Sequence, residues 1–432
     1  MILDVSRTNV TTARSSADPA RGQLSELYQR VRAKSVELST PLAPEDMVIQ
    51  SMPDASPTKW HLAHTSWFFE TFVLKEAVPG YRPLDERYGY LFNSYYEGVG
   101  AQFPRAERGL LSRPTVEEVL SYRRAVDTGI EAFFHDASDE VLRRYAFVLE
   151  VGINHEEQHQ ELMVTDIKTV LCRNPLEPAY APEPVPASGQ TPALDWVKFG
   201  GGLVEIGDSD EGFAFDNERP RHRVYVEPFE LATRPVSWAE FLDFIQDGGY
   251  RRPELWLSDG WAEVQASGWS APLYWREEDG GWSLYTLHGR RPLDAAEPVC
   301  HVSYYEADAF ARWAGARLPT ELEWEVAAGE ESAEGAFLES GALHPTAMSG
   351  SGPAQLLGDA WEWTASAYAP YPRFRTEEGA AGEYNGKFMS GQMVLRGGSC
   401  ATPRSHIRIT YRNFFPPDAR WQFTGIRLAR DP

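Results

Sequence analysis

The chain has 432 residues, a formal net charge of −22 and an aromatic content of 12%. Two or more domains with large cores are expected at this length. Nucleic acid and anionic membranes would be repelled by so acidic a protein, which leaves small molecules as the expected partners. The three cysteines are far apart, so neither a disulfide framework nor a zinc ribbon is expected. No signal peptide or long apolar run is found, and a soluble, cytoplasmic protein is predicted.

A loose arm is expected over residues 1–20, followed by an antiparallel four-helix bundle over residues 21–173. The first helical segment, "QLSELYQRVRAKSVEL", places its apolar residues near one helical face. The second, "SPTKWHLAHTSWFFETFVL", begins with Ser56 as the expected N-cap and Pro57 at the first helical position.

The third and fourth helical segments also have predictable boundaries. "TVEEVLSYRRAVDTGIEAFF" opens with a capping-box spelling, from Thr115 to Glu118. The fourth segment is expected to run from about Asp139 to Cys172. The connection between the second and third segments, about residues 76–113, is long and rich in Gly, Tyr and Arg. A loop of this length inside a compact domain is usually functional.

The composition changes after the bundle. Residues 174–194 are rich in proline and small residues and predict a semi-rigid linker. Beyond them, β-like runs such as "RHRVYVEPFELA" and "QMVLRGGS" are separated by Gly, Pro and Asp clusters. Helices are predicted for "SWAEFLDFIQ" and "YYEADAFARWAG". Residues 195–432 are therefore predicted to form an irregular α+β domain.

The fourth helical segment contains "NHEEQHQ", in which His155 and His159 are one helical turn apart. They share a stripe with Gly152, which leaves room beside them, and this stripe is expected to face the bundle interior. His64 shares a face of the second segment with several aromatic residues. For His64 alone, ordinary core packing is the simpler interpretation. His155 and His159 both point inward, so their buried ring nitrogens need polar or metal partners. Together with His64 they would form a metal site of three imidazoles from two facing helices.

Two alternatives concern the metal and its ligands. His61 lies one turn before His64 and is a rival third ligand that periodicity does not exclude. The same letters fit the HExxH pattern of zinc proteases, which would make Glu156 a general base. The zinc-protease interpretation needs a third metal ligand on a helix after the motif, but the proline-rich linker follows directly and no such helix is predicted. Three neutral imidazoles leave an open face that suits Zn(II) with water or Fe(II) with dioxygen and substrate.

The two halves of the chain resemble two known families. "MPDASPTKWHLAHTSWFFE", "LFNSYYEGVG" and "NHEEQHQELM" resemble the helical domain of ergothioneine-type sulfoxide synthases, within the DinB-like metal-binding superfamily. "RLPTELEWEVAA", "GDAWEWTASAY" and "VLRGGSC" resemble the formylglycine-generating-enzyme (sulfatase-modifying factor) domain, a variant of the C-type lectin fold. The resemblance implies an α + (α+β) protein, with a DinB-like four-helix bundle followed by a C-type-lectin-like domain.

The resemblance implies a non-haem Fe(II) enzyme that uses dioxygen. It would join the thiol of cysteine to imidazole C2 of hercynine (Nα-trimethylhistidine) and give a sulfoxide. The implied metal ligands are His64, His155 and His159, and His61 then becomes structural. A thiolate is a soft ligand that suits iron. A zinc-dependent DinB-like thiol transferase and a lectin-like binding protein are the alternatives from other classes.

The resemblance also implies contacts to the histidine-derived substrate. Gln158 would hold the imidazole through its amide, and Asn413 is similar to the residue of the second domain that contacts this substrate. A trimethylammonium group favours aromatic walls, for which Phe414 and Phe415 are candidates. Ordinary core packing is the alternative for both phenylalanines.

Four further residues are assigned to chemistry and to the thiol substrate. Tyr95 and Tyr96, in "NSYYE", are expected to include a donor of a proton or an electron to reduced oxygen. Arg105 is a candidate clamp for the cysteine carboxylate. Asp54 would hold the cysteine ammonium or cap a helix.

Cysteine is the expected sulfur donor. Family members that use γ-glutamylcysteine carry an acidic residue and an arginine shortly after the asparagine, but Asp418 and Arg420 do not match that spacing. The "NSYYE" tyrosines resemble the ovothiol branch, whose 5-histidylcysteine sulfoxide synthases use free cysteine. The chain ends at Pro432 without the methyltransferase usual in that branch, which favours ergothioneine biosynthesis. γ-Glutamylcysteine and the ovothiol-type reaction remain the alternatives.

Overall fold

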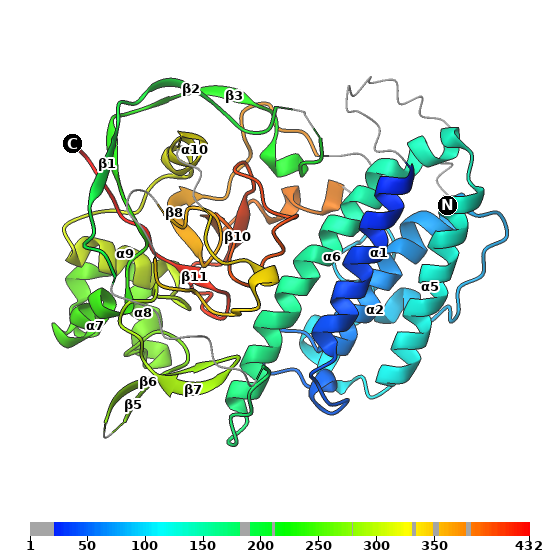
Figure 1. The fold of residues 1–432 in the computed structure, drawn as a ribbon, viewed down its shortest axis with the longest axis horizontal. Coiled ribbons are helices and arrows are strands. Elements are labelled where there is room, and N and C mark those ends of the chain that lie inside the picture. Colours follow the sequence, from blue (N-terminus) through cyan, green and yellow to red (C-terminus); the bar gives the residue numbers. More distant parts are fainter. Residues whose placement is uncertain are drawn as a thin grey trace.

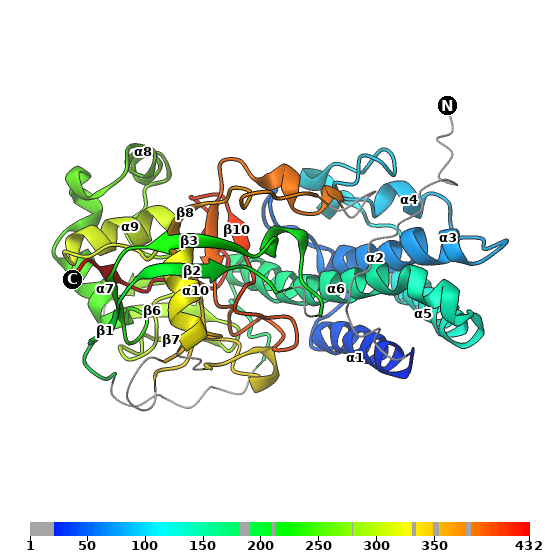
Figure 2. The same ribbon diagram turned by 90° about the horizontal axis from the view of Figure 1, so that it is seen from above.

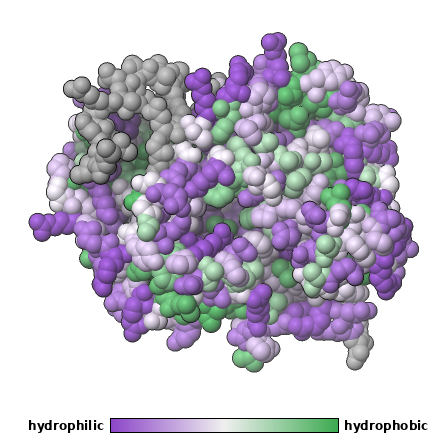
Figure 3. Space-filling model, turned by 180° about the vertical axis from the view of Figure 1, so that it is seen from behind, coloured by the Kyte–Doolittle hydropathy of each residue, from purple (hydrophilic) through white to green (hydrophobic). Residues whose placement is uncertain are grey.

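A helical half and an α+β half lie side by side in the computed structural model (Figure 1). The structure describes residues 21–181, 191–209, 212–278, 280–330, 334–348, 354–376 and 382–432. The predicted arm lies outside the described residues, as does the middle of the predicted linker, residues 182–190. Within the described ranges, no helix is long and apolar enough to cross a membrane. Hydrophilic residues cover most of the face seen in Figure 3, in keeping with the high net charge.

The helical half contains the predicted bundle. Its long helices are α1 (Arg21–Ser39), α2 (Thr58–Phe69), α5 (Val116–Asp136) and α6 (Asp139–Arg173). Helix α2 packs against α5 and α6, and α1 packs against α6. A π-helical turn, Glu70–Leu74, continues α2 into the short α3 (Lys75–Ala77). The long predicted loop contains α4 (Tyr88–Leu91) and a 3-10 helix, Arg105–Leu110.

The predicted helix starts are right in one case and wrong in another. The capping box is confirmed, because Thr115 and Glu118 each accept a hydrogen bond from the other's backbone N–H. The Ser56 prediction is wrong, because Pro57 occupies the N-cap of α2. The Ser56 hydroxyl instead accepts a hydrogen bond from Arg108 at 2.9 Å. A tertiary partner therefore replaces the local cap.

The second half is built from small sheets and short helices. Strands β1 (Trp196–Phe199), β4 (Phe229–Ala232) and β12 (Ala429–Arg430) form one sheet. A four-stranded sheet has the order β10 (Asn413–Phe415), β9 (Met393–Arg396), β8 (Trp361–Ala367) and β11 (Thr424–Gly425). Strands β2 (Gly202–Ile206) and β3 (His222–Val226) form a two-stranded sheet. A further three-stranded sheet has the order β5 (Trp275–Glu278), β6 (Gly281–Thr286) and β7 (Gly289–Pro292).

The helices of this half are α7 (Trp238–Gln246), α8 (Ser258–Ser267), α9 (Tyr304–Trp313) and α10 (Glu321–Glu330). The segments predicted as β-like match β3, β4 and β9, and the two predicted helices match α7 and α9. Ser237 and Ser303 cap these two helices in capping boxes. Local sequence therefore predicts the elements that have their own boundary signals.

Helix α6 lies on the side of the bundle that faces the second half (Figure 1), and one of its ends reaches the second half in the view from above (Figure 2). Its Glu161 carboxylate is buried and accepts three hydrogen bonds from the second half. The donors are Trp361 Nε1 at 2.7 Å, Ser399 Oγ at 2.7 Å and Thr402 Oγ1 at 2.8 Å. Further along α6, the buried Lys168 Nζ lies 2.7 Å from His301 Nε2. Buried polar contacts thus fix the second half on α6.

The opposite side of α6 carries a buried ion cluster. The Glu156 carboxylate lies 2.9 Å from Arg32, forms a second ion pair with Arg123, and accepts a hydrogen bond from Ser35 at 2.6 Å. Burial alone would raise the pKa of Glu156, but the two guanidinium groups and the hydroxyl lower it to about 2. The acid of the HExxH spelling therefore faces α1 and α5, where it cannot act as a base beside the histidines.

Replacing Glu156 by glutamine should destabilise the fold. Glu156→Gln would leave two buried guanidinium groups without their shared charge, so the free energy of unfolding should fall by about 3 kcal/mol or more. Urea denaturation followed by circular dichroism measures this change. The matched control is Glu131→Gln on the exposed face of α5, where a change within about 0.5 kcal/mol is expected. Equal unfolding midpoints for the two variants would contradict the assigned role of Glu156.

Candidate metal and substrate site

Three buried histidines meet between α2 and α6. His64, His155 and His159 each offer one ring nitrogen, and these atoms all lie within 4.8 Å of one another. His64 Nε2 and both nitrogens of His155 are buried without a hydrogen-bond partner. Buried polar atoms without partners cost about 1–3 kcal/mol each, so a bound cation would relieve a real penalty. The donor set therefore fits a metal ion held by three imidazoles.

Neighbouring groups fix the tautomers of two of these rings. His64 Nδ1 lies 2.6 Å from the carbonyl of Phe92, which can only accept, so the proton is on Nδ1 and Nε2 is free. His61 bridges Asp166 and His159, with its Nε2 3.0 Å from the carboxylate and its Nδ1 2.8 Å from His159 Nδ1. His159 therefore donates from Nδ1 and keeps Nε2 free. His61, the rival ligand, orients His159 and lies outside the triad.

Aromatic packing holds the rings in place. His64 is stacked between Trp60 and Trp67, with ring centroids 4.6 and 5.4 Å away. A Cβ atom at Gly152 would lie 2.5 Å from Phe69, so only glycine lets α2 and α6 approach this closely. The sequence prediction that Gly152 leaves room beside the histidines is therefore confirmed.

Burial keeps the three imidazoles neutral. Burial lowers the pKa of His64 and of His159 well below the ordinary value, and it lowers the pKa of His155 to about 3. Neighbouring imidazoles add to the effect for His64 and His159. Neutral imidazole is the form that binds metals, so these rings are prepared for a cation near neutral pH.

A cavity of about 470 Å³ lies beside the triad, between the two halves. Both halves contribute to its wall. Seven of the eight residues predicted to contact substrate or reacting atoms line it: Asp54, Tyr95, Arg105, Gln158, Asn413, Phe414 and Phe415. Tyr96 does not line it, and its ring stacks behind Tyr95 at a centroid distance of 4.7 Å.

The predicted charged pair, Arg105 and Asp54, is exposed at the cavity edge, where Arg105 donates a hydrogen bond to the backbone carbonyl of Asp54. Sequence reasoning missed Arg108, one turn further along. Arg108 is buried over Trp60, 3.4 Å from the ring centroid, and donates to Ser56 Oγ and to Ser94 Oγ at 3.1 Å. Burial, and then the charge of Arg105, lower its pKa to about 9, so it remains a cation at neutral pH.

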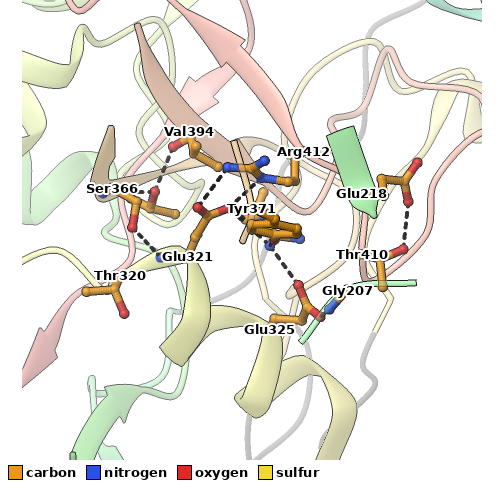
Figure 4. Close-up of polar contacts among 12 residues, drawn as sticks. Gly207, Glu218, Thr320, Glu321, Glu325, Ser366, Tyr371, Val394, Thr410 and Arg412 are labelled. Carbon is orange, nitrogen blue, oxygen red and sulfur yellow. Dashed lines mark hydrogen bonds and ion pairs between the residues drawn. The ribbon is translucent and has the colours of Figure 1, made fainter. Parts of the chain in front are cut away.

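The second half supplies an aromatic wall. The ring of Phe414, on β10, stacks on that of Tyr368 with a centroid distance of 4.0 Å. The ring centroids of Phe415 and Trp421 lie 5.9 Å apart. Both phenylalanines are half-buried, so they pack against the domain and also face the cavity. Two positions before Phe414 in the chain, Arg412 also lines the cavity and is held by Glu321 through hydrogen bonds of 2.8 and 2.9 Å (Figure 4). This ion pair fixes the start of β10.

Two tyrosines that the sequence did not indicate reach the cavity from the second half. The Tyr384 hydroxyl donates to Gln158 Oε1, and Gln158 Nε2 donates to the Tyr411 hydroxyl at 2.6 Å. Tyr384 also lies near the triad, with its ring centroid 5.7 Å from that of His155. They are more than 200 positions from Gln158 in the chain, and no local pattern links them to it.

The segment with Tyr95 is fastened to the second half beside the cavity. Glu383 accepts hydrogen bonds from the backbone N–H groups of Glu97 and Gly98, at 3.0 and 2.9 Å. Lys387 donates to the backbone carbonyl of Tyr95 and forms an ion pair with Glu383. We name these contacts the Glu383–Lys387 clasp. It holds the Tyr95 segment over the cavity.

Comparison with known proteins identifies relatives over most of the chain. The Sulfatase-modifying factor enzyme 1-like domain model matches residues 182–349 and 338–432, and the DinB superfamily model matches residues 27–163. These matches confirm the predicted fold class, with a DinB-like helical region followed by a formylglycine-generating-enzyme-like region.

Two curated relatives match most of the chain, and a third matches little more than half of it. The chain is 33% identical over 435 residues to a hercynine oxygenase of Mycobacterium tuberculosis, which covers 95% of this chain and 99% of that protein. Identity to a hercynine oxygenase of Mycolicibacterium smegmatis is also 33%, over 88% of this chain and 92% of the relative. A formylglycine-generating enzyme of Streptomyces coelicolor is 29% identical over 59% of this chain and 95% of its own length.

Metal affinity of this site should depend little on pH in the range where ordinary histidines titrate. Because burial lowers the folded-state pKa values, protons compete for the ring nitrogens only well below pH 6. From pH 7.5 to 6.0, three imidazoles with the ordinary pKa of about 6.5 would lose roughly fifty-fold in affinity. The folded site should lose less than about three-fold. Titration of metal-free protein with Co(II), followed by absorption, measures this.

The control for that titration is a pair of histidine variants. His155→Ala removes one predicted ligand and should abolish stoichiometric Co(II) binding. His135→Ala removes an exposed histidine of α5 and should leave it unchanged. A fifty-fold loss of affinity at pH 6.0, or unaltered binding by His155→Ala, would contradict the assigned ligand set.

Proposed function

The chain belongs to the hercynine oxygenase family, and from this premise we propose that it is a non-haem Fe(II)- and O2-dependent sulfoxide synthase of ergothioneine biosynthesis. It forms a C–S bond between the thiol of cysteine and imidazole C2 of hercynine. The observation that carries the proposal is the buried histidine triad beside a cavity whose wall combines a cation, an amide and aromatic rings. Each of these groups matches a part of the two substrates.

The metal is assigned to His64, His155 and His159. When bound, Fe(II) would supply positions for a thiolate and for dioxygen, and the redox chemistry by which the sulfur is oxidised and joined to imidazole C2. The three imidazoles are neutral ligands and bring no carboxylate or thiolate of their own, which leaves the remaining positions to substrates. His61 and Asp166 keep His159 in the tautomer that binds a metal.

We assign the cysteine carboxylate to Arg108. This guanidinium is buried in the cavity wall, and no ion pair to it occurs among the described residues. Arg105, exposed at the edge, adds a second positive charge. The cysteine ammonium is assigned to Asp54 at the edge and to Asp166, whose Oδ1 is buried without a partner in the same wall.

The position of Arg420 supports cysteine as the donor. Its guanidinium forms an ion pair with Glu306 at 2.9 Å and lies 4.1 Å from the Trp269 ring centroid. Neither Arg420 nor Asp418 lines the cavity. The pair that would hold a γ-glutamyl group therefore does not reach the cavity. Arg412, which does line this side of the cavity, is already paired with Glu321.

Hercynine is assigned to the wall beside α6 and β10. Gln158 meets the imidazole and Asn413 the carboxylate side of the molecule. Phe414 and Phe415 face the trimethylammonium group, because a quaternary cation is attracted to aromatic faces.

Tyr95 is the proposed proton donor. It lines the cavity, and burial raises the pKa of its hydroxyl, so it remains protonated and able to donate. Tyr96 lies behind it and holds its ring by stacking. The hydroxyl proton of Tyr384 is already donated to Gln158, which leaves Tyr95 as the available tyrosine.

A direct assay tests the reaction. Fe(II)-loaded protein supplied with air, hercynine and cysteine should consume oxygen and give a coupled sulfoxide, whose mass is that of the two substrates together plus one oxygen atom and less two hydrogen atoms. γ-Glutamylcysteine in place of cysteine should react at least about ten-fold less efficiently in kcat/KM, a difference of about 1.4 kcal/mol. Zn(II)-loaded protein is the control and should be inactive. Activity with Zn(II) would favour the thiol-transferase alternative, and no adduct with either donor would refute the synthase.

Arg108→Ala tests the assignment of the thiol substrate. Loss of a charge-assisted carboxylate contact should raise the KM for cysteine by about ten-fold or more, with little change in the KM for hercynine. Steady-state kinetics with each substrate varied in turn measures both constants. Arg124→Ala, on the exposed face of α5, is the matched control. Equal effects on both KM values would mean that Arg108 supports the fold of the cavity and does not bind cysteine.

A further inference from the structure

A row of hydrogen bonds leads from the backbone of α6, through the second half, to the cavity wall. Its members, in order, are Asn154, His406, Tyr411, Gln158 and Tyr384. The first and fourth belong to α6 and the other three to the second half. All except Gln158, which is half-buried, are buried. The row thus connects a helix backbone to the part of the wall assigned to the imidazole.

The direction of donation in each hydrogen bond of the row follows from its first member, Asn154. Asn154 Nδ2 lies 2.9 Å from the backbone carbonyl of Glu150, which can only accept, so Asn154 Oδ1 faces His406. His406 Nδ1, at 3.1 Å from Oδ1, must therefore carry a proton. Glu157 Oε2 lies 3.7 Å from the same nitrogen, in agreement with a proton there. Burial, and then the charge of Arg408, lower the pKa of His406, so the ring is neutral and Nε2 accepts.

The remaining directions follow from this neutral ring. The Tyr411 hydroxyl donates to His406 Nε2 at 2.9 Å, so the Tyr411 oxygen accepts from Gln158 Nε2 at 2.6 Å. Gln158 Oε1 then faces Tyr384, which donates to it. Turning the amide over would set Oε1 against the Tyr411 oxygen, whose proton is already donated. Two acceptors would face each other, so only one amide orientation satisfies every member.

We propose that His406 and Tyr411 are positioning residues that orient the Gln158 amide, so that the cavity meets the substrate ring with the oxygens of Gln158 and Tyr384. Both oxygens keep lone pairs after the row is complete. The wall therefore selects an imidazole that donates a ring N–H, and it disfavours a ring methylated on that nitrogen. This inference rests on the proposed function, because it specifies the ring chemistry that the same site accepts.

Wild-type protein gives the first test. Hercynine and its two ring-N-methylated isomers are titrated into the full-length protein by calorimetry. At least one methylated isomer should bind ten-fold or more weakly than hercynine. Equal binding of all three compounds would overturn the inference. Failure of hercynine itself to bind would count against the proposed function, so the two failures are distinguishable.

The second test separates positioning from packing. Tyr411→Phe removes only a hydroxyl that donates to His406 and accepts from Gln158. It should raise the Kd and KM of hercynine about five- to ten-fold, leave the KM of cysteine within two-fold, and reduce the discrimination against the methylated isomer. His406→Leu breaks the row one step earlier and should give the same selective loss.

The matched control is Tyr285→Phe. Tyr285 is a buried tyrosine of β6, outside the cavity wall, whose hydroxyl donates to a backbone carbonyl at 2.6 Å. Its substitution should leave both KM values and the discrimination unchanged. If Tyr411→Phe behaves like this control while wild-type protein turns hercynine over, the positioning role is refuted and the proposed function stands.

Discussion

A carboxylate buried between two guanidinium groups sets the rotation of α6. Successive helical residues are about 100° apart, so once Glu156 faces Arg32 and Arg123 the directions of its neighbours follow. His155 and His159 then face α2, and Gln158 and Glu161 face the second half. Desolvating these charges is costly, so the cluster is expected to contribute more to specifying this rotation of α6 than to net stability.

Sequence periodicity predicted what is local, and missed what depends on docking of the two halves. The stripe of Gly152, His155 and His159 followed from helical spacing, because each residue's direction depends only on its own helix. Arg108, Tyr384 and Tyr411 became visible only when segments far apart in the chain were brought together. The Ser56 cap failed for the same reason, since a guanidinium from a distant segment occupies its hydroxyl. Glu156 matches the acid of the HExxH pattern, but it is paired with Arg32 and Arg123, so the pattern alone does not predict the environment of that side chain.

The two halves divide the work of the site. The helical half supplies the imidazoles and the cations, on helices whose packing fixes their geometry. The second half supplies aromatic rings and hydroxyl groups, from β10 and the loops before it. The cavity wall is made by both halves together. The Arg412–Glu321 ion pair, which fixes β10, lies wholly in the second half (Figure 4). Specificity can thus vary in one half while the proposed metal site in the other is unchanged.

The buried contacts of Glu161 and Lys168 limit the ways in which substrates can enter the cavity and products can leave it. A hinge that separated the halves would expose a carboxylate and an ammonium that now have buried partners, so opening by rotation of one half against the other is costly. The Glu383–Lys387 clasp is different, because its ion pair is partly exposed and such pairs contribute only about 0–1 kcal/mol. Entry and exit are therefore expected to be governed by local loop motion, on the nanosecond to microsecond scale, and not by the slower closure of domains.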